Sequence, residues 1–466
     1  MKNLDFLNPV EDIYTLPFGE RWMLFSPRTM TSAMVNEAAV KALAAFTVDP
    51  VSGTPGAIKS LFERLTDNPR SLNQYAASLE KLVIIPTRSC NMRCVYCDFD
   101  PLAIKNTTLD PGLACKLIDY SAERLAPKPS SVLRIHFFGG EPLVARQCVE
   151  TAVHYSRMVC AWRNLVPWFE ITTNGFFDPT AIPLIGDYMD SAVISIDGNA
   201  PFHDFNRRRP DGSGTYGVVS KNIRSLSRFP VELSLRACIT QQSVDAMTDI
   251  ASHFCQEFDF DLLCFEMMTP NPPSCRAGLT PPDARRFAAG VLKAEAIAGK
   301  YNVRVIQGPS ELVGPRRTSC PVGLGTLMLT PEGLLTACYL ETQRWTSLGI
   351  DPVLGRVDPD SGPIIEPEKI DGIAALLDSK PRCNKCFCRH TCAGGCHIEQ
   401  TSPGCSLEYD NRCRATRMVT AGRLLRNLEG QTAAEAFVDN PGAVQSIADH
   451  PDDRLSTWIL REKEKK

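Results

Sequence analysis

Three cysteines lie close together near residue 90 and could hold a metal cluster. They are Cys90, Cys94 and Cys97, in the segment S-C-N-M-R-C-V-Y-C-D of residues 89–98. Thiolates are soft ligands that suit iron–sulfur clusters or zinc. A closed 4Fe–4S cluster takes four cysteines, so three on one loop leave an iron that can bind a small chelating molecule. A structural zinc site is the alternative, but it needs a fourth Cys or His nearby, and the next cysteine is Cys115.

The spacing C-x3-C-x2-C, with Tyr96 before the last cysteine, resembles the signature of the radical S-adenosylmethionine (SAM) superfamily. In that family the open iron takes the amino and carboxylate groups of SAM. One electron then splits the sulfonium and gives a 5′-deoxyadenosyl radical. The resemblance implies that Cys90, Cys94 and Cys97 are the cluster ligands and the catalytic centre.

From residue 82 onward, apolar runs alternate with amphipathic stretches, which predicts a parallel sheet with helices outside it. The predicted strands are Leu82–Thr87, Val132–Phe138, Phe169–Thr173, Ala192–Ile196, Glu232–Cys238 and Asp261–Phe265. The predicted helices are Pro111–Arg124, Leu143–Arg163, Pro179–Met189, Tyr216–Ser227, Val244–Glu257 and one that starts at Pro281. The predicted fold class is α/β. It is a partial (β/α)6 TIM-like barrel, followed by a cysteine-rich domain and preceded by a small α+β domain.

Polar motifs follow these strands at their carboxyl ends, the face on which α/β barrels carry their chemistry. The paired glycines before Glu141 allow a backbone to approach a ligand closely. By the resemblance, Glu141 holds the SAM amino group, and residues after strands four and five hold its carboxylate and ribose. The predicted SAM-binding residues are Tyr96, Gly139, Gly140, Glu141, Asn174, Ser195, Asp197, Arg207 and Arg236.

A second set of cysteines matches, one by one, the SPASM extension found behind many radical SAM enzymes; a zinc ribbon fits less well, because only one close C-x2-C pair is present. The set is Cys320, Cys338, Cys383, Cys386, Cys392, Cys396 and Cys413. The resemblance implies two auxiliary 4Fe–4S clusters, hence three clusters in all. One would be held by Cys383, Cys386, Cys392 and Cys413, and the other by Cys320, Cys338 and Cys396. The second has either an open iron or a fourth ligand, Cys405 or Cys388.

Tyr339 follows the hairpin cysteine Cys338, where anaerobic sulfatase maturases place an Asp as catalytic base. Tyr339 could act as base or radical relay, or simply pack beside the cluster. This difference ranks peptide crosslinking ahead of formylglycine formation. The expected function is SAM cleavage followed by a thioether or carbon–carbon crosslink in a ribosomally made peptide. The alternatives are maturation of an enzyme such as a sulfatase and, from another class, a non-catalytic electron carrier.

The predicted domain limits are residues 1–80, 81–308, 309–430 and a C-terminal tail at 431–466. The charged end of the tail, R-E-K-E-K-K, is typical of a solvated chain end, and the tail could also lie over the open side of the barrel. Two short strands and two or three small helices in residues 1–80 resemble a RiPP recognition element, which binds a peptide leader; a plain cap over the barrel is the alternative. The predicted partners are a peptide substrate with its leader and a reductant such as flavodoxin or ferredoxin.

Composition points to a protein of the cell interior. The net charge is −3, which does not favour nucleic acid, and neither a signal segment nor a membrane span is predicted. Nine of the 19 cysteines fall between Cys320 and Cys413, which favours metal over disulfides in a cytoplasmic protein.

Overall fold

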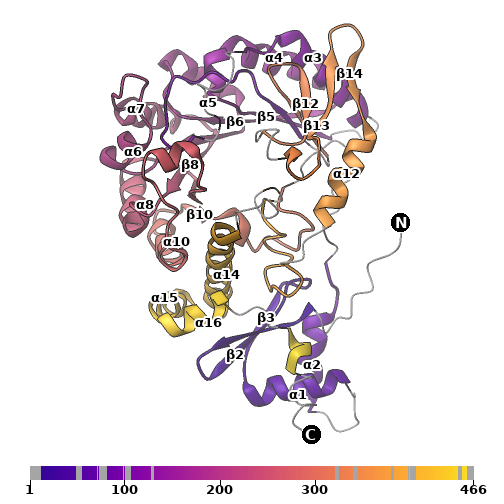
Figure 1. Ribbon diagram of the computed structural model, residues 1–466, viewed down its shortest axis with the longest axis vertical. Helices are drawn as coiled ribbons and strands as arrows, with labels where there is room; N and C mark the ends of the chain where they lie inside the picture. Colours follow the sequence, from indigo (N-terminus) through magenta and orange to yellow (C-terminus); the bar gives the residue numbers. More distant parts are fainter. Residues whose placement is uncertain are drawn as a thin grey trace.

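The structure is a computed structural model that describes residues 12–48, 55–70, 72, 81–97, 99, 107–126, 131–320, 325–339, 345–378, 383–396, 398, 406–449 and 454–458. Figure 1 shows a curved sheet with helices along its outer side and an N-terminal domain at the opposite end of the molecule. The cysteine-rich segment lies between the two.

One sheet of eleven strands forms the barrel and continues into the cysteine-rich segment, in the order β10-β9-β8-β7-β6-β5-β4-β11-β12-β13-β14. The strands from β10 to β11 in this order are parallel, and the last pairings are antiparallel. The strands are β4 (Lys81–Ile84), β5 (Val132–Phe137), β6 (Val166–Thr173), β7 (Ser191–Ser195), β8 (Glu232–Ile239), β9 (Leu262–Met267), β10 (Arg304–Ile306), β11 (Thr326–Leu329), β12 (Leu334–Thr336), β13 (Val353–Asp358) and β14 (Gly362–Ile365).

The predicted α/β fold with a partial barrel is confirmed: the six predicted strands form consecutively paired parallel strands, and within the described residues the two sheet ends do not pair with each other. Strand β5 buries every second side chain, Leu133, Ile135 and Phe137, and several other strands, such as β4 and β11, bury consecutive side chains. The hairpin after residue 325 pairs with β4 through β11, so the cysteine-rich segment shares the barrel's sheet.

The helices mostly cover the outer face of the sheet, and local capping sets where several begin. Asp110 and Asp283, for example, accept bonds from backbone N–H groups in the first turns of α3 and α10. The helices are α3 (Pro111–Leu125), η2 (Pro142–Ala145), α4 (Arg146–Arg163), η3 (Pro179–Ala181), α5 (Ile182–Tyr188), α6 (Ala200–Asn206), α7 (Tyr216–Leu226), η4 (Val244–Ala246), α8 (Met247–Glu257), α9 (Pro272–Arg276), α10 (Ala284–Gly299), η5 (Gly308–Ser310), α12 (Pro367–Asp378), α14 (Ser406–Glu429), α15 (Gln431–Asp439) and α16 (Pro441–Asp449).

The N-terminal domain is a three-stranded antiparallel sheet followed by two helices. Its elements are β1 (Tyr14–Phe18), β2 (Arg21–Ser26), β3 (Thr31–Asn36), α1 (Glu37–Val48) and α2 (Gly56–Thr66). The third strand was not predicted from the sequence, although T-S-A-M-V-N follows a turn and pairs fully with β2. The third of the small helices expected within residues 1–80, over residues 72–79, lies largely outside the described residues.

Residues 431–449 and 454–458 of the predicted tail pack against the rest of the chain, and its charged end lies outside the described residues. Helices α15 and α16 bury Phe437 and Ile447 against the main core. Trp458 then packs into the core of the N-terminal domain, edge-on to Trp22, and its indole N–H donates to Thr15 Oγ1 at 2.9 Å. In these helices apolar residues recur every three or four positions and drive the packing. The polar and charged residues between them made this pattern hard to recognise in the sequence.

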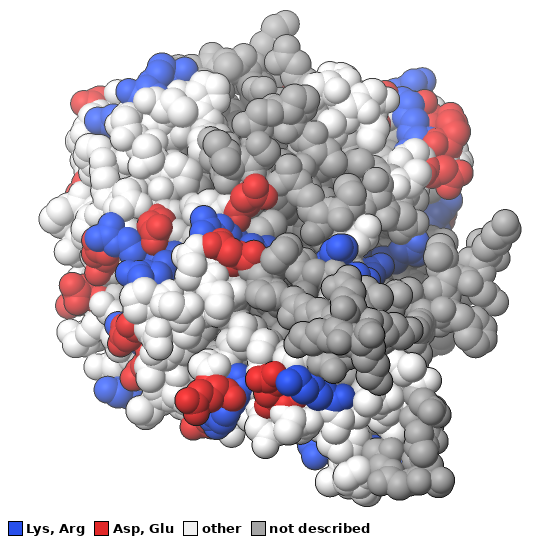
Figure 2. Space-filling model, turned by 60° about the horizontal axis from the view of Figure 1, so that its bottom comes forward, with Lys and Arg blue, Asp and Glu red and all other residues white. Residues whose placement is uncertain are grey.

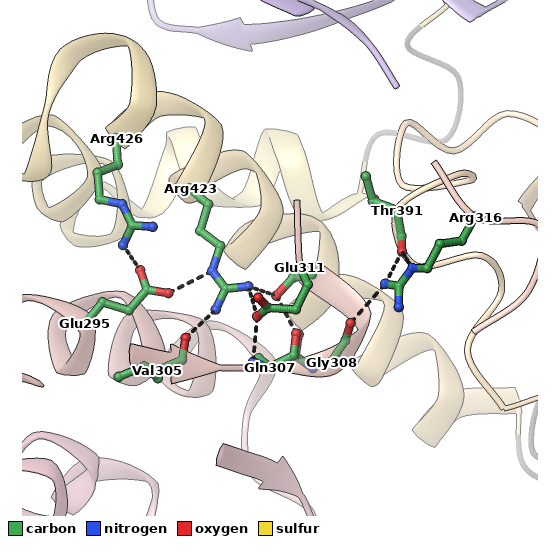
Figure 3. A network of polar contacts seen from close by, with 10 residues as sticks. Glu295, Val305, Gln307, Gly308, Glu311, Arg316, Thr391, Arg423 and Arg426 are labelled. Atoms are coloured by element: carbon green, nitrogen blue, oxygen red, sulfur yellow. Dashed lines mark hydrogen bonds and ion pairs between the residues drawn. The ribbon is translucent and has the colours of Figure 1, made fainter. Parts of the chain in front are cut away.

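A buried ionic network fastens α14 to the open edge of the barrel (Figure 3). Arg423 donates to Glu295 on α10 at 2.7 Å, to Glu311 at 2.7 Å and to the Val305 carbonyl of β10 at 3.2 Å. Arg426 pairs with the other oxygen of Glu295. Because Glu295 and Arg423 are almost fully enclosed, breaking either would leave an unpaired buried charge.

Among the coloured residues of the face in Figure 2, acidic and basic side chains lie next to one another. Exposed ion pairs such as Arg224 with Glu257 and Arg286 with Asp245 join neighbouring elements. In the part of the chain that the structure describes, no helix combines the length and apolar character needed to span a bilayer.

Candidate functional site

The cysteine loop is fixed by backbone hydrogen bonds at the carboxyl edge of the sheet. Arg93 N–H donates to the Arg208 carbonyl at 2.7 Å, and Val95 N–H donates to the Asn206 carbonyl at 2.9 Å. The loop therefore rests on the segment that follows β7 and α6. This contact joins the cysteine loop to the segment after the fourth predicted strand, although more than 100 residues of chain separate them.

The two glycines of the next motif allow it to touch the start of the cysteine loop. Gly139 has φ +141°, a conformation that favours glycine. A Cβ on Gly140 would lie 2.3 Å from the Ser89 carbonyl oxygen, closer than any real contact. The Gly140 and Glu141 N–H groups donate to the carbonyls of Thr87 at 3.1 Å and Ser89 at 2.9 Å.

Glu141 is a buried carboxylate beside the cysteine loop. It accepts bonds from Thr173 Oγ1 at 2.9 Å and from the N–H groups of Asn174 at 2.7 Å and Leu143 at 3.1 Å. Burial nevertheless raises its pKa to about 7, with the three donors opposing the rise. Asn174 also donates through Nδ2 to Cys90 Sγ at 3.5 Å, so this carboxylate and one cysteine share a neighbour.

Asp197 lies beside the cysteine loop and is fully buried. Its oxygens accept from Tyr96 Oη, from Asn206 Nδ2 at 3.1 Å and from Cys238 N–H at 3.0 Å. Arg207 Nε lies 3.0 Å from Asp197 Oδ1, and its guanidinium lies 5.3 Å from the centre of the Tyr96 ring. The structure thus brings the predicted SAM-binding residues Tyr96, Asp197 and Arg207 together. Protein groups donate hydrogen bonds to both carboxylate oxygens of Asp197. Direct contact of Asp197 with SAM stays a prediction.

Ser195 and Arg236 form a second predicted pair on β7 and β8. Arg236 Nη2 donates to Ser195 Oγ at 3.4 Å, and the two residues are register partners in the sheet. Arg236 also lies near enough to Tyr339 to oppose the rise in that phenol's pKa. It therefore stands between the predicted SAM side of the barrel and the cysteine-rich segment.

The first three thiols fit a bound cluster. Burial raises the pKa of Cys90 and of Cys94 to about 12, so binding iron to them must release protons. In the described part of the chain, no three metal-ligating side chains converge on one point as the ligands of a single ion would. Cysteines of a cubane each bind a different iron and need no such convergence.

The later cysteines fall into two groups by their mutual electrostatic effects. Cys383, Cys386 and Cys392 each help to raise the pKa of Cys413, behind the larger effect of burial. A hydrogen bond from the Cys388 thiol, assisted by the Arg417 charge, lowers the pKa of Cys386. Of the two candidate fourth ligands for the other cluster, Cys388 therefore lies beside this first group, and Cys405 lies outside the described residues.

Tyr339 marks the second group. Burial is the main cause of its raised pKa, and Cys338, Cys396 and Cys320 add to the rise, so all three thiols are neighbours of this phenol. The ring lies 5.0 Å from Phe138 and 5.9 Å from Phe99, although 45 % of the residue surface is exposed. A phenol keeps its proton at neutral pH with or without this rise, so the pKa does not choose between packing, relay and base.

The aromatic group links the two cysteine regions. Phe99 follows Cys97, Phe138 precedes Gly139 and Tyr339 follows Cys338. The Phe99 and Phe138 ring centres are 5.6 Å apart. Sequence analysis missed Phe99 and Phe138, and it also missed Asn206. Their position directly beside the motifs was the only available signal.

Residues 84–240 match the family model of the radical SAM superfamily. Residues 84–240 are a radical SAM domain. The domain spans the cysteine loop, the Gly139–Glu141 motif and the Asp197 cluster, and the family uses a 4Fe–4S cluster together with SAM. When bound, these groups supply a 5′-deoxyadenosyl radical. The chain's own residues position the cysteine loop and enclose Glu141 beside it.

The chain is also similar to curated relatives and, in its fold, to solved structures. The chain is 22 % identical over 356 residues to the cysteine-type anaerobic sulfatase-maturating enzyme of Clostridium perfringens, which covers 72 % of this chain and 93 % of that relative. The fold resembles native anSMEcpe with bound AdoMet and Cp18Cys peptide, with a TM-score of 0.59, 18 % identity and coverage of 74 % and 98 % of the two chains. Streptococcus suis SuiB bound to precursor peptide SuiA matches at a TM-score of 0.45, 15 % identity and coverage of 84 % and 97 %.

Proposed function

We propose that this radical SAM enzyme oxidatively modifies a cysteine residue in a peptide, and that the favoured product is a crosslink such as a thioether. The observation that carries the proposal is the meeting of three features around Tyr339. The Tyr339 ring contacts Phe99 next to the cysteine loop and Phe138 of the barrel. Arg236 of the barrel and Cys338 of the later cysteines are its charged neighbours. A substrate side chain placed there would face both the radical source and an auxiliary cluster.

The clusters are assigned in the same proposal. Cys90, Cys94 and Cys97 hold the SAM-binding cluster, and two auxiliary clusters use the later cysteine groups. A small reductant such as flavodoxin or ferredoxin supplies the electron. Cluster potentials range from roughly −700 to +450 mV with burial and hydrogen bonding, so an auxiliary cluster can either give or take an electron.

The N-terminal domain is proposed to bind the leader of the peptide. Extended peptides bind by adding a strand to a sheet edge. On one edge, β1 already bridges to the C-terminal segment through Tyr14 and Arg454. On the other edge, β3 pairs only with β2 among the described residues, which leaves it as the edge that a leader could join.

Maturation of a sulfatase-type enzyme is the second candidate. The relative that covers 72 % of this chain is a cysteine-type anaerobic sulfatase-maturating enzyme. Against it stands Tyr339, which follows Cys338 where anaerobic sulfatase maturases place an Asp as catalytic base.

Anaerobic incubation with SAM, dithionite and peptide separates these functions. One arm contains the Cp18Cys peptide, and the other contains a short cysteine-containing peptide encoded beside this gene, with and without its leader. We expect a mass loss of two hydrogens in the second peptide, faster when the leader is present. Formylglycine in Cp18Cys would favour the second candidate. An absence of 5′-deoxyadenosine in every arm would refute both functions and favour an electron carrier.

A further inference from the structure

Arg417 joins the cysteine group around Cys386 to the C-terminal helices. It lies on α14, four residues after Cys413, and residues at that spacing share one face of a helix. Its Nε donates to the Ala448 carbonyl at 2.9 Å, and its Nη2 donates to the same oxygen. Arg417 therefore extends from the helix that carries Cys413 to the end of α16.

The end of α16 holds the guanidinium in one orientation. Ala448 lies in the last turn of α16, where the carbonyls have no partner within the helix and the helix dipole favours a cation. Both bonds use the edge of the guanidinium that carries Nε and Nη2. A guanidinium has five N–H donors in a fixed plane, so the donors on Nη1 stay available for another neighbour.

That neighbour is the Cys386 thiol. The Cys388 thiol lowers the pKa of Cys386 most, burial opposes this effect, and the charge and a side-chain hydrogen bond of Arg417 lower the pKa further. Burial raises the pKa of Cys413, and the charge of Arg417 opposes that rise. Two proposed ligands of one cluster, from segments far apart along the chain, therefore have the same arginine beside them.

A second donor near these thiols lacks an acceptor. Tyr14 of β1 is fully buried, and its hydroxyl has no hydrogen-bond partner among the described residues. Burial raises the pKa of Tyr14, and the charges of Asp12 and Cys386 add to the rise, so Cys386 is a neighbour. Buried hydroxyls usually have a partner, and a cluster bound by these thiols would bring sulfur acceptors to this place. The residues present therefore fit a cluster.

We propose that Arg417 donates a hydrogen bond to the Cys386 thiolate of the auxiliary cluster and so raises the reduction potential of that cluster, with α16 positioning the guanidinium. This inference rests on the proposed function, which assigns the cluster to Cys383, Cys386, Cys392 and Cys413. Reduction adds one electron, and so one negative charge, to the cluster. A cation and hydrogen-bond donors at a ligand sulfur stabilise the reduced form more than the oxidised form.

Pulsed EPR of the reduced cluster tests the contact itself. The full-length protein is labelled with ¹⁵N in the arginine guanidinium groups only, reconstituted anaerobically and reduced with dithionite. A background with Cys94→Ala and Cys338→Ala removes the signals of the other two proposed clusters. We expect a hyperfine coupling between ¹⁵N and the cluster spin, and its loss in Arg417→Lys, whose ammonium carries no label. Absence of the coupling, or a coupling that persists in Arg417→Lys, would overturn the proposal.

A redox titration in the same background measures the effect on the potential. We expect Arg417→Gln to lower the ratio of reduced to oxidised cluster at a fixed potential about tenfold, which equals about 59 mV for a one-electron couple. Arg417→Lys keeps the charge but not the planar fork of donors, so it should lower the ratio by less. Arg414→Gln is the matched control, because Arg414 pairs with Asp449 at the same end of α16, at 2.6 Å, and the pair is exposed to solvent. Its ratio should stay within about twofold of the background.

Iron content separates the possible failures. An unchanged potential in Arg417→Gln, at equal iron content, would refute the tuning role and leave Arg417 as a cap of α16. An equal shift in Arg414→Gln would show that any cation at this helix end acts, which would also refute the specific contact. If Arg417→Gln loses the cluster, the ¹⁵N coupling and the Arg417→Lys titration still decide. Full iron content in Cys386→Ala would instead refute the cluster assignment of the proposed function.

Discussion

Gly140→Ala should damage SAM cleavage because it adds one methyl group between two backbone segments. The new Cβ would lie 2.3 Å from the Ser89 carbonyl oxygen and 2.5 Å from that of Arg88, whereas ordinary contacts begin near 3.4 Å. Both atoms belong to the main chain and cannot rotate away. The backbone at residue 140 is not among those with positive φ, so the clash is the only penalty.

The size of the effect follows from that distance. Restoring an ordinary contact moves the start of the cysteine loop by about 1 Å, and a misplacement of that size can cost about 100-fold in rate. Overpacking in a fixed backbone also costs typically 1–3 kcal/mol of stability. We therefore expect 5′-deoxyadenosine formation to fall about 100-fold, together with a lower iron content.

The assay measures deoxyadenosine with SAM and dithionite in anaerobically reconstituted protein, and unfolding by urea in the same preparations. Gly217→Ala on α7 is the matched control, since nothing lies within 4 Å of its added Cβ. It should keep full activity and gain up to about 1 kcal/mol of stability. Deoxyadenosine formation by Gly140→Ala within twofold of the wild type, at equal iron content, would refute the close-contact reasoning.

Three further outcomes test other parts of the structure by urea unfolding. Burial raises the pKa of Glu141 to about 7 from 4.5, so the cluster-free protein should lose about 3 kcal/mol of stability as pH rises from 4.5 through 7, and Glu141→Gln should lose this dependence. Arg423→Ala should cost about 3–5 kcal/mol by leaving Glu295 unpaired, against less than about 1 kcal/mol for the exposed pair in Arg224→Ala. Trp458→Ala should cost about 3 kcal/mol or more and expose the N-terminal domain to trypsin, at unchanged iron content.

Contradicting results are equally specific. Parallel pH curves for the wild type and Glu141→Gln would remove the buried-carboxylate argument. Similar losses in Arg423→Ala and Arg224→Ala would show that the network of Figure 3 is no stronger than a surface pair. Rapid trypsin cleavage of the wild-type N-terminal domain would contradict the docking of Trp458.

The sequence predicted the features that depend on local pattern. Strand–helix alternation and the C-x3-C-x2-C loop identified the barrel and the radical SAM domain, because periodicity and ligand spacing are encoded within short segments. The Gly139–Glu141 motif was recognisable for the same reason. The resemblance supplied the roles of Glu141 and Arg236, and the structure brings these residues to the same edge of the sheet.

The features that were missed depend on contacts between distant segments. Trp458 packs near Thr15 across almost the whole length of the chain, and no local pattern announces such a contact. Arg417 and Ala448 lie on different helices and meet only in the folded chain. The pairing of β11 with β4 likewise comes from tertiary structure, and it makes the barrel and the cysteine-rich segment one sheet.

The central claim is that three thiols hold a cluster whose open iron binds SAM. Its most direct test is 5′-deoxyadenosine formation by the anaerobically reconstituted protein with dithionite, compared with Cys94→Ala. The account predicts deoxyadenosine from the wild type and none above background from the variant, at an iron content lowered by about one cubane. Zinc in place of iron, or equal deoxyadenosine from both proteins, would contradict it.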